Sequence, residues 1–174
     1  IIIKTTNGGT NWTSWWGGTI KLLFDVFFAD ESNGTAVGED GTIIKTTDGG
    51  ITWTSKTSGT TNILYGISFS DANNGVAVGS LGTILKTSNN GKDWILQTSG
   101  VTEDLRAVSL IDTNNALAVG NGILRTTDGG QNWVLQYDNT NNYWLDISFS
   151  DANNGMVAGI SGKIIRTTDA GATW

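Results

Sequence analysis

The side chains of this sequence that could carry out acid–base chemistry are carboxylates, because its 174 residues include no histidine and no cysteine. Hydrolysis of a glycoside needs two carboxyl groups at a defined separation, and sixteen acidic residues are available. A repeated pattern accounts for seven of them as turn residues. The nine that remain are Asp25, Glu31, Glu39, Asp40, Asp93, Glu103, Asp104, Asp138 and Asp146. Asp25 and Asp146 occupy the same position of their repeats, so residue types alone leave a hydrolase open.

Arginine side chains are the candidates for binding an anion. Of the three arginines, Arg125 and Arg166 occupy a position that is basic in every repeat. In the other repeats that position holds Lys4, Lys45 and Lys86. Such recurrence indicates a structural or solvated position, although a ring of like cations can also form an anion-binding patch. Arg106 lies outside this position and is a candidate ligand-binding residue.

Aromatic side chains interrupt two segments that are otherwise rich in Thr, Ser, Gly and Asn. The candidate binding residues in these segments are Trp15, Trp16, Tyr137, Asp138 and Tyr143. Aromatic rings serve equally as stacking platforms for a sugar or peptide and as packing anchors, so both interpretations stay open. Trp144 aligns with Leu23, Leu64 and Leu105 of the other repeats and is predicted to lie in the core.

Composition excludes several classes of function. The net charge of −6 disfavours nucleic acid as a partner. The lack of His and Cys removes the usual zinc sites and the His- or Cys-based nucleophiles, and we expect no metal and no cofactor. No apolar run approaches the roughly 20 residues of a membrane span, so membrane insertion is not expected.

The chain is a series of repeats of about 41 residues. Trp12, Trp53, Trp94, Trp133 and Trp174 are spaced by 41, 41, 39 and 41 residues, and an Asp follows each of the first four after 18 residues. The shorter spacing has a visible cause, because residues 79–83 of one repeat match only residues 120–122 of the next. Each repeat reads as four short strands separated by Asn/Asp/Gly turns, and no stretch has helical periodicity. These features predict an all-β fold of four-stranded antiparallel propeller blades.

The repeat also predicts where the blades begin and end. Residues 1–21 supply the last two strands of one blade, residues 22–62, 63–103 and 104–142 form three whole blades, and residues 143–174 form an incomplete one. Alternate apolar residues of each first strand, such as Ile67 and Phe69, share one sheet face that we expect to stack against the next blade. The unequal number of strands predicts an arc of a larger ring of six to eight blades. The rest of a longer chain is then an expected partner.

Five hairpins share the pattern [ST]-x-[DN]-x-G-x-x-W. Its Asp or Asn and its Trp are Asn7 and Trp12, Asp48 and Trp53, Asn89 and Trp94, Asp128 and Trp133, and Asp169 and Trp174. The Asp or Asn can accept hydrogen bonds from loop amides, the Gly supplies a positive φ, and the Trp covers the loop. Each hairpin offers at most one carboxylate at that position, whereas calcium takes six to eight oxygens. A structural turn is therefore favoured over a metal site.

This pattern resembles the Asp-box, or bacterial neuraminidase repeat, and residues 41–50 make the chain similar to the photosystem II stability/assembly factor propellers of bacterial secreted proteins. The resemblance implies a non-catalytic binding or scaffold module for a protein or glycan, located outside the cell or on its surface, with the periplasm as an alternative. It also implies two alternatives, namely an Asp-box glycoside hydrolase of sialidase or xyloglucanase type and a chaperone for photosystem assembly. The Arg-Ile-Pro motif of the sialidases is absent, since the chain has no proline.

Overall fold

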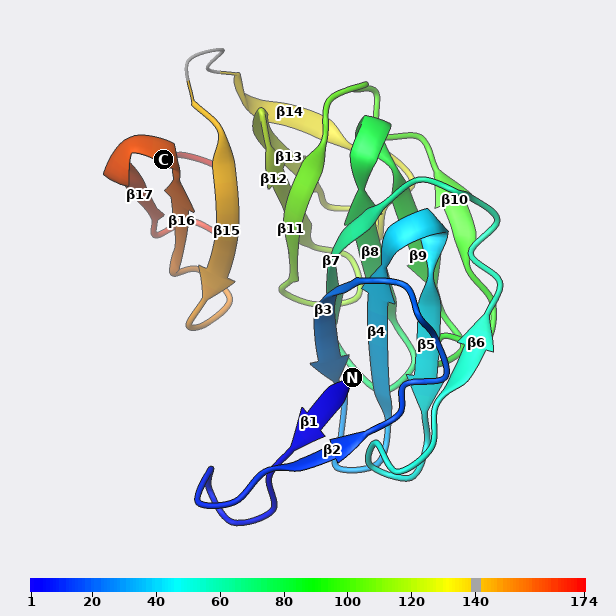
Figure 1. Ribbon diagram of the computed structural model, residues 1–174. Helices are drawn as coiled ribbons and strands as arrows, with labels where there is room; N and C mark the ends of the chain where they lie inside the picture. The colour runs from blue at the N-terminus through cyan, green and yellow to red at the C-terminus, as the bar shows by residue number, and fades with distance from the viewer. Residues whose placement is uncertain (139–141) are drawn as a thin grey trace.

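The computed structural model, which describes residues 1–138 and 142–174, consists of antiparallel β-sheets that follow one another along an arc (Figure 1). A two-stranded sheet pairs β1 (Ile2–Lys4) with β2 (Thr13–Trp15). The next sheet contains β3 (Leu23–Phe28), β4 (Gly34–Gly38), β5 (Ile43–Thr46) and β6 (Thr54–Lys56). It is followed by β7 (Leu64–Phe69), β8 (Gly75–Gly79), β9 (Ile84–Thr87) and β10 (Ile95–Gln97).

Two further sheets complete the arc. One contains β11 (Leu105–Leu110), β12 (Ala116–Gly120), β13 (Gly122–Thr126) and β14 (Val134–Asp138). The last contains β15 (Trp144–Phe149), β16 (Gly155–Gly159) and β17 (Ile164–Thr167). The strands within each sheet follow chain order, as in a propeller blade. The all-β class and the predicted open arc of blades are therefore confirmed.

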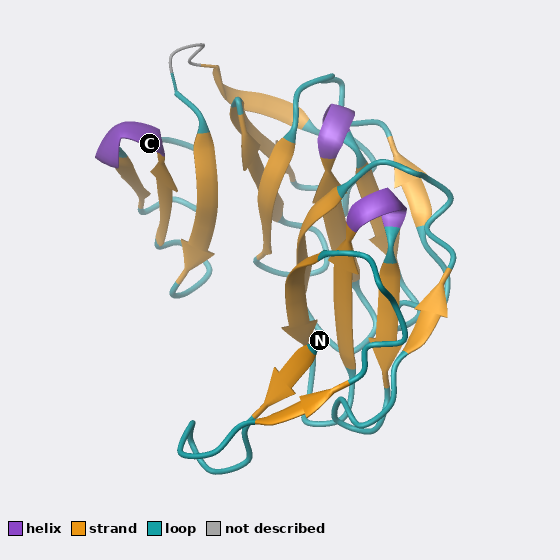
Figure 2. Ribbon diagram, in the orientation of Figure 1, coloured by secondary structure: helices purple, strands orange, loops and turns teal. Residues whose placement is uncertain are grey.

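Three of the sheets connect their second and third strands through a short 3₁₀ turn (Figure 2). These turns are η1 (Glu39–Gly41), η2 (Ser80–Gly82) and η3 (Ile160–Gly162). The fourth sheet passes from β12 to β13 through Asn121 alone, which is where the sequence is two residues shorter. Apart from these turns, the described residues contain no helix, and none of them forms a helix able to cross a membrane.

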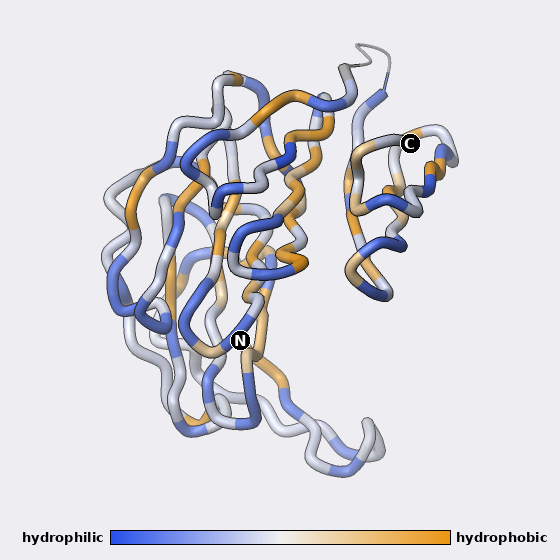
Figure 3. The backbone as a smooth tube through the Cα atoms, turned by 180° about the vertical axis from the view of Figure 1, so that it is seen from behind, coloured by the Kyte–Doolittle hydropathy of each residue, from blue (hydrophilic) through white to orange (hydrophobic). Residues whose placement is uncertain are grey.

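The core lies between successive blades. Along the chain, apolar segments in the strands alternate with polar turns (Figure 3). Ile67 and Phe69 of β7 pack with Val37 and Ile43 of the preceding sheet. The expectation that this face stacks against the next blade was therefore wrong. Period-two alternation identifies the residues that share a face, but the direction in which the sheets follow one another decides which neighbour that face meets.

Both ends of the arc expose side chains of types that the middle blades bury. Val26 and Phe28 of β3 are 49% and 42% exposed, whereas the equivalent Ile67 and Phe69 of β7 are 4% and 7% exposed. At the other end, Met156 and Ile164 are likewise exposed. Burial at these positions thus comes from the neighbouring blade and not from the blade itself.

Each Asp-box hairpin is held by short-range hydrogen bonds, as the second hairpin illustrates. The Asp48 carboxylate accepts hydrogen bonds from the backbone N–H of Ile51 (3.0 Å) and Thr52 (2.9 Å). The Trp53 indole donates to the Gly50 carbonyl at 3.1 Å, and Gly50 has a φ of 89°. These contacts close the loop beneath the indole ring without involving another blade.

Three of the recurring basic residues, all of them lysines, connect a blade to the Asp-box hairpin of the next. Lys4 Nζ donates to the Gly49 carbonyl and Lys45 Nζ to the side-chain oxygen of Asn90, both at 2.6 Å. Lys86 makes the corresponding hydrogen bond to the carbonyl of Gly129. For these three lysines the geometry supports the structural interpretation over an anion-binding patch.

Replacing Lys45 by alanine is expected to lower the free energy of unfolding by about 1.5–3 kcal/mol, the range for hydrogen bonds to charged groups. Lys45 is only 5% exposed, and burial lowers the pKa of its ammonium group. Its loss leaves Asn90 without this donor at the contact between two blades. Urea denaturation of Lys45→Ala and of the control Lys92→Ala, whose side chain is exposed, measures the effect. Equal stability of the two variants would contradict this role for Lys45.

Candidate functional site

The first strands of the blades carry a β-bulge near their start. The pairing register shifts between Leu64 and Gly66 in β7 and between Leu105 and Ala107 in β11. The residues at the bulges of the four first strands are Phe24, Tyr65, Arg106 and Leu145. A bulge directs a side chain away from the regular ladder and is frequent beside functional sites. Since β3, β7, β11 and β15 pack side by side in sequence along the arc, these positions lie along its inner strands (Figure 1).

Arg106 lies beside two tyrosine rings, that of Tyr65 at the bulge of β7 and that of Tyr143, which precedes β15. Its guanidinium carbon lies 4.0 Å from the centroid of the Tyr65 ring and 5.3 Å from that of Tyr143. Arg106 Nε donates a hydrogen bond to the Tyr143 hydroxyl, and Nη2 donates to the Asp104 carboxylate at 3.0 Å. Phe24 extends the row of aromatic side chains, edge-on to Tyr65 with ring centroids 5.5 Å apart. We call Phe24, Tyr65, Asp104, Arg106 and Tyr143 the Arg106 cluster.

The Arg106 cluster is preorganised and accessible. The side chains of Arg106 and Asp104 are 31% and 29% exposed, and Phe24 is 46% exposed. A guanidinium group has five N–H donors, and the two hydrogen bonds to Tyr143 and Asp104 leave others for a ligand. The stacked rings supply cation–π stabilisation that holds the group in place. The arrangement can therefore bind an oxygen acceptor beside an aromatic surface.

The structure brings together only part of the set of binding residues proposed from the sequence. Arg106 and Tyr143 are in direct contact. Tyr137 instead packs on Trp144, with ring centroids 6.2 Å apart. Trp144 is 1% exposed, which confirms its predicted place in the core. Asp138 ends β14, but its side chain lies outside the described part of the chain.

The two tryptophans near the amino terminus belong to another part of the arc. Trp15 ends β2, is half-buried and lies opposite Ile2 of β1. Trp16 follows it and is 64% exposed. Figure 1 places β1 and β2 at one end of the arc, whereas β11 and β15 lie further along it. These tryptophans therefore do not belong to the Arg106 cluster.

Asp25 and Asp146, two of the nine acidic residues that the sequence left open to an enzyme, accept hydrogen bonds from backbone amides. Asp25 accepts hydrogen bonds from the N–H of Ile67 (2.9 Å) and of Val26 (2.8 Å), and burial raises the pKa of its carboxyl group. Asp146 accepts one from the N–H of Ile147 at 2.9 Å. Asp25 thereby joins β3 to β7, which is a structural role. Within the described residues, no group of acidic side chains could hold a metal ion.

Sequence reasoning missed Phe24, Tyr65 and Asp104 as members of the site. The available signal was the second position of each first strand, which reads Phe, Tyr, Arg and Leu along the four repeats. An aromatic or long polar residue at this second position indicates a candidate site residue once the strand is known to carry a bulge there. The sequence does not reveal the bulge itself, because bulges depend on the pairing of two strands.

Comparisons with known proteins agree with this architecture. Residues 57–140 match the family model described as Photosynthesis system II assembly factor YCF48. No curated protein sequence matches the chain.

Similar solved structures show the same fold. One is YCF48 bound to D1 peptide, with 18% identity, a TM-score of 0.62, and coverage of 90% of this chain and 80% of that one. YCF48 from Cyanidioschyzon merolae has 18% identity and a TM-score of 0.78, covering 98% of this chain and 64% of that one. A GH74 enzyme from Niastella koreensis has 19% identity and a TM-score of 0.72, covering 87% of this chain and 29% of that one. These matches show that the chain has the β-propeller fold and that it is similar to the photosystem II assembly factors.

Proposed function

We propose that this chain is a non-catalytic binding or scaffold module of an extracytoplasmic protein, and that it recognises a polypeptide segment at the Arg106 cluster. The observation that carries the proposal is the position of the Arg106 guanidinium group beside the rings of Tyr65 and Tyr143. Some of its N–H donors remain available to a ligand. The extracytoplasmic location is part of this proposal, and its support is the resemblance to propellers of secreted proteins. The structure of a similar protein with a bound peptide supports a polypeptide ligand for this fold.

The chemistry of the Arg106 cluster favours an extended peptide over a neutral sugar. Carbonyl and carboxylate oxygens accept charge-assisted hydrogen bonds from guanidinium N–H groups, which are stronger than neutral ones. Phe24 is half-exposed and stands beside Tyr65, so an apolar peptide side chain can pack on it while the peptide oxygen meets Arg106. Binding then combines a polar anchor with an adjacent apolar contact, as protein interfaces commonly do.

Replacing Arg106 by glutamine is expected to weaken peptide binding by about 10- to 100-fold, because a hydrogen bond to a charged group contributes about 1.5–3 kcal/mol. The experiment first selects ligands from a peptide array and then measures dissociation constants for the parent and the variant. Arg106→Lys keeps the charge but loses the planar donor set, so it should restore only part of the affinity. Arg166→Gln is the matched control, since Arg166 also donates one hydrogen bond to a side chain, that of Asn154 at 3.0 Å. Unchanged affinity in Arg106→Gln, with an unchanged melting temperature, would contradict a site at this residue.

A glycoside hydrolase is the second candidate, and the likeness in fold to the GH74 enzyme of Niastella koreensis is the observation that favours it. The carboxylates of Asp25 and Asp146, however, already accept backbone hydrogen bonds. Release of reducing ends from xyloglucan by the purified protein, lost in a folded Asp25→Asn variant, would overturn the non-catalytic proposal. A chaperone role in photosystem assembly has its support in the family match alone.

A further inference from the structure

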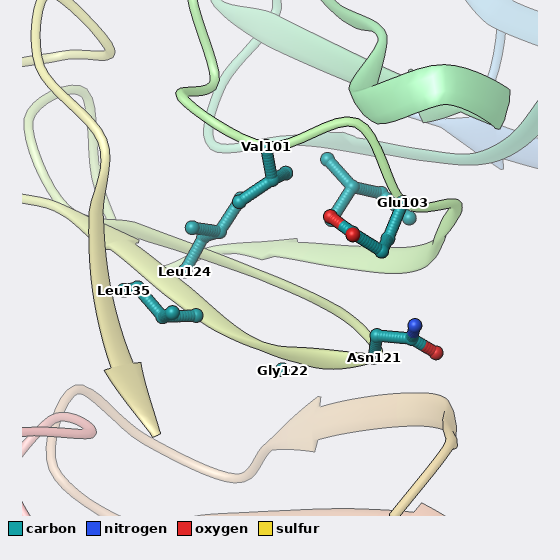
Figure 4. A pocket seen from close by; sticks show the side chains of 7 residues that line it. Val101, Glu103, Asn121, Gly122, Leu124 and Leu135 are labelled. Carbon is teal, nitrogen blue, oxygen red and sulfur yellow. The ribbon is translucent and has the colours of Figure 1, made fainter. Parts of the chain in front are cut away.

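A cavity of about 260 Å³ lies between the segment that follows β10 and the outer strands of the next sheet. Four of the residues that line it are apolar, and two, Glu103 and Asn121, are polar. The residues that define it are Val101, Leu105, Leu124, Leu135, Glu103 and Asn121 (Figure 4). Figure 4 shows the Glu103 carboxylate turned toward the side on which Val101 and Leu124 lie, with the Asn121 amide turned away from the leucines. The volume is below the range of typical drug-sized sites, so it suits a small group.

The cavity lies beside the shortened connection of the fourth sheet, because Asn121 and Gly122 are part of its lining. In the preceding sheet, Thr83 Oγ1 accepts a hydrogen bond from the Asn62 side chain at 2.8 Å, and Ser80 Oγ accepts one from the Ile63 N–H at 3.1 Å. Residues 80–83 correspond to only Asn121 and Gly122 in the fourth sheet. The fourth sheet therefore has no counterpart of the Ser80 and Thr83 hydroxyl groups at its connection.

The same change leaves a carboxylate without its partner across the connection. The repeat position of Glu103 is occupied elsewhere by Lys21, Asn62 and Asn142. Each of these bonds a residue of its own strand-two to strand-three connection, and the pairs are Lys21 with Asp40, Asn62 with Thr83, and Asn142 with Lys163. Among the residues that the structure describes, the Glu103 carboxylate accepts one hydrogen bond, from the neighbouring Thr102 N–H at 3.1 Å, and the backbone carbonyl of Glu103 accepts another from the Gly82 N–H. Within that part of the chain no cation pairs with this carboxylate, which lies beside a partly apolar cavity.

We propose that this cavity binds an alkylammonium group, that is, a primary amine on a short apolar stem such as a lysine side chain or a free alkylamine. The ammonium pairs with the Glu103 carboxylate, while the stem lies against Val101, Leu124 and Leu135. An amine with an apolar stem matches both parts of the site, because burial of its CH₂ groups against apolar side chains is favourable and the carboxylate attracts the ammonium charge. The site is independent of the peptide proposed for the Arg106 cluster.

The test is a titration of the isotope-labelled chain by amide NMR with n-butylamine, methylamine, n-butanol and butyrate. We expect saturable shifts at the backbone amides around Val101, Leu124 and Leu135 with n-butylamine only. Methylamine lacks the apolar stem, n-butanol lacks the charge, and butyrate carries a charge of the opposite sign, so each probe tests one feature of the ligand. Equal binding of butyrate or n-butanol, or shifts confined to other blades, would overturn the proposal.

Substitutions at Glu103 provide the second arm of the test. Glu103→Gln should weaken butylamine binding by about threefold to fivefold, and Glu103→Lys should abolish saturable binding. Glu39→Gln is the matched control, since Glu39 is likewise an acid that accepts one backbone hydrogen bond, from Leu22 N–H at 3.2 Å. Unchanged binding in a folded Glu103→Lys variant refutes the role of this carboxylate. A capped pentapeptide with a central lysine distinguishes the source, because tighter binding than butylamine assigns the site to a lysine of a partner protein and weaker binding assigns it to a free amine.

Discussion

Replacing Trp94 by alanine is expected to lower the free energy of unfolding by about 3–5 kcal/mol, the usual cost of removing a buried tryptophan. Trp94 is 8% exposed and belongs to the core between the second and third sheets. Its ring meets Phe69 edge-on, with centroids 6.1 Å apart. Urea denaturation followed by circular dichroism measures the loss, and peptide binding at the Arg106 cluster should persist wherever the variant is folded.

The chain offers a matched control for this substitution. Trp12 occupies the same position of the first hairpin but is 57% exposed. Trp12→Ala should therefore cost under about 1 kcal/mol, in keeping with substitutions outside a packed core. Equal losses in the two variants would mean that closure of the hairpin, and not burial between blades, determines the contribution of this tryptophan.

Acidification is expected to destabilise the fold as the pH falls from about 4 to about 2. Hydrogen bonds donated by Thr52 lower the pKa of Asp48 to about 2, Asn132 does the same for Asp128, and Thr173 for Asp169. Hydrogen bonds from nearby turn residues also lower the pKa of the turn aspartates Asp30, Asp71, Asp112 and Asp151. The unfolded chain binds these protons at a pKa near 3.9. The stabilisation is thus complete above that value and is lost as the carboxylates of the folded state become protonated.

Two of the hairpins show how to test this pH dependence, since Asn7 and Asn89 stand where the others have aspartate. Asn89 still accepts a hydrogen bond from the Asp93 N–H at 3.0 Å. A variant with Asp48→Asn, Asp128→Asn and Asp169→Asn should keep its hairpins, and its stability should fall less steeply between pH 4 and pH 2. Thermal unfolding over this pH range gives the slope. The same slope in the variant and the parent would assign acid unfolding to other carboxylates.

The sequence by itself determined the blade architecture and the Asp-box hairpins, because both depend on interactions that are short in range or repeat at a fixed period. Spacings of 41 and 39 residues identified the repeating unit and located the shortened connection at Asn121. Within a hairpin, Asp48 reaches its donors three and four residues away, so residue types at fixed offsets were sufficient. The core position of Trp144 followed in the same way from alignment with leucines of the other repeats.

Only the tertiary structure decided which side chains meet between blades. Tyr143 contacts Arg106 across 37 residues, and Lys45 bonds Asn90 across 45. Both contacts depend on how the sheets stack around the arc, because stacking sets the neighbour of each sheet face. A sequence pattern with a period of two does not predict that neighbour. The bulges that direct Tyr65 and Arg106, and the cavity beside Glu103, likewise arise where two strands or two blades meet. The repeat therefore specified each blade, while packing between blades determined the candidate sites.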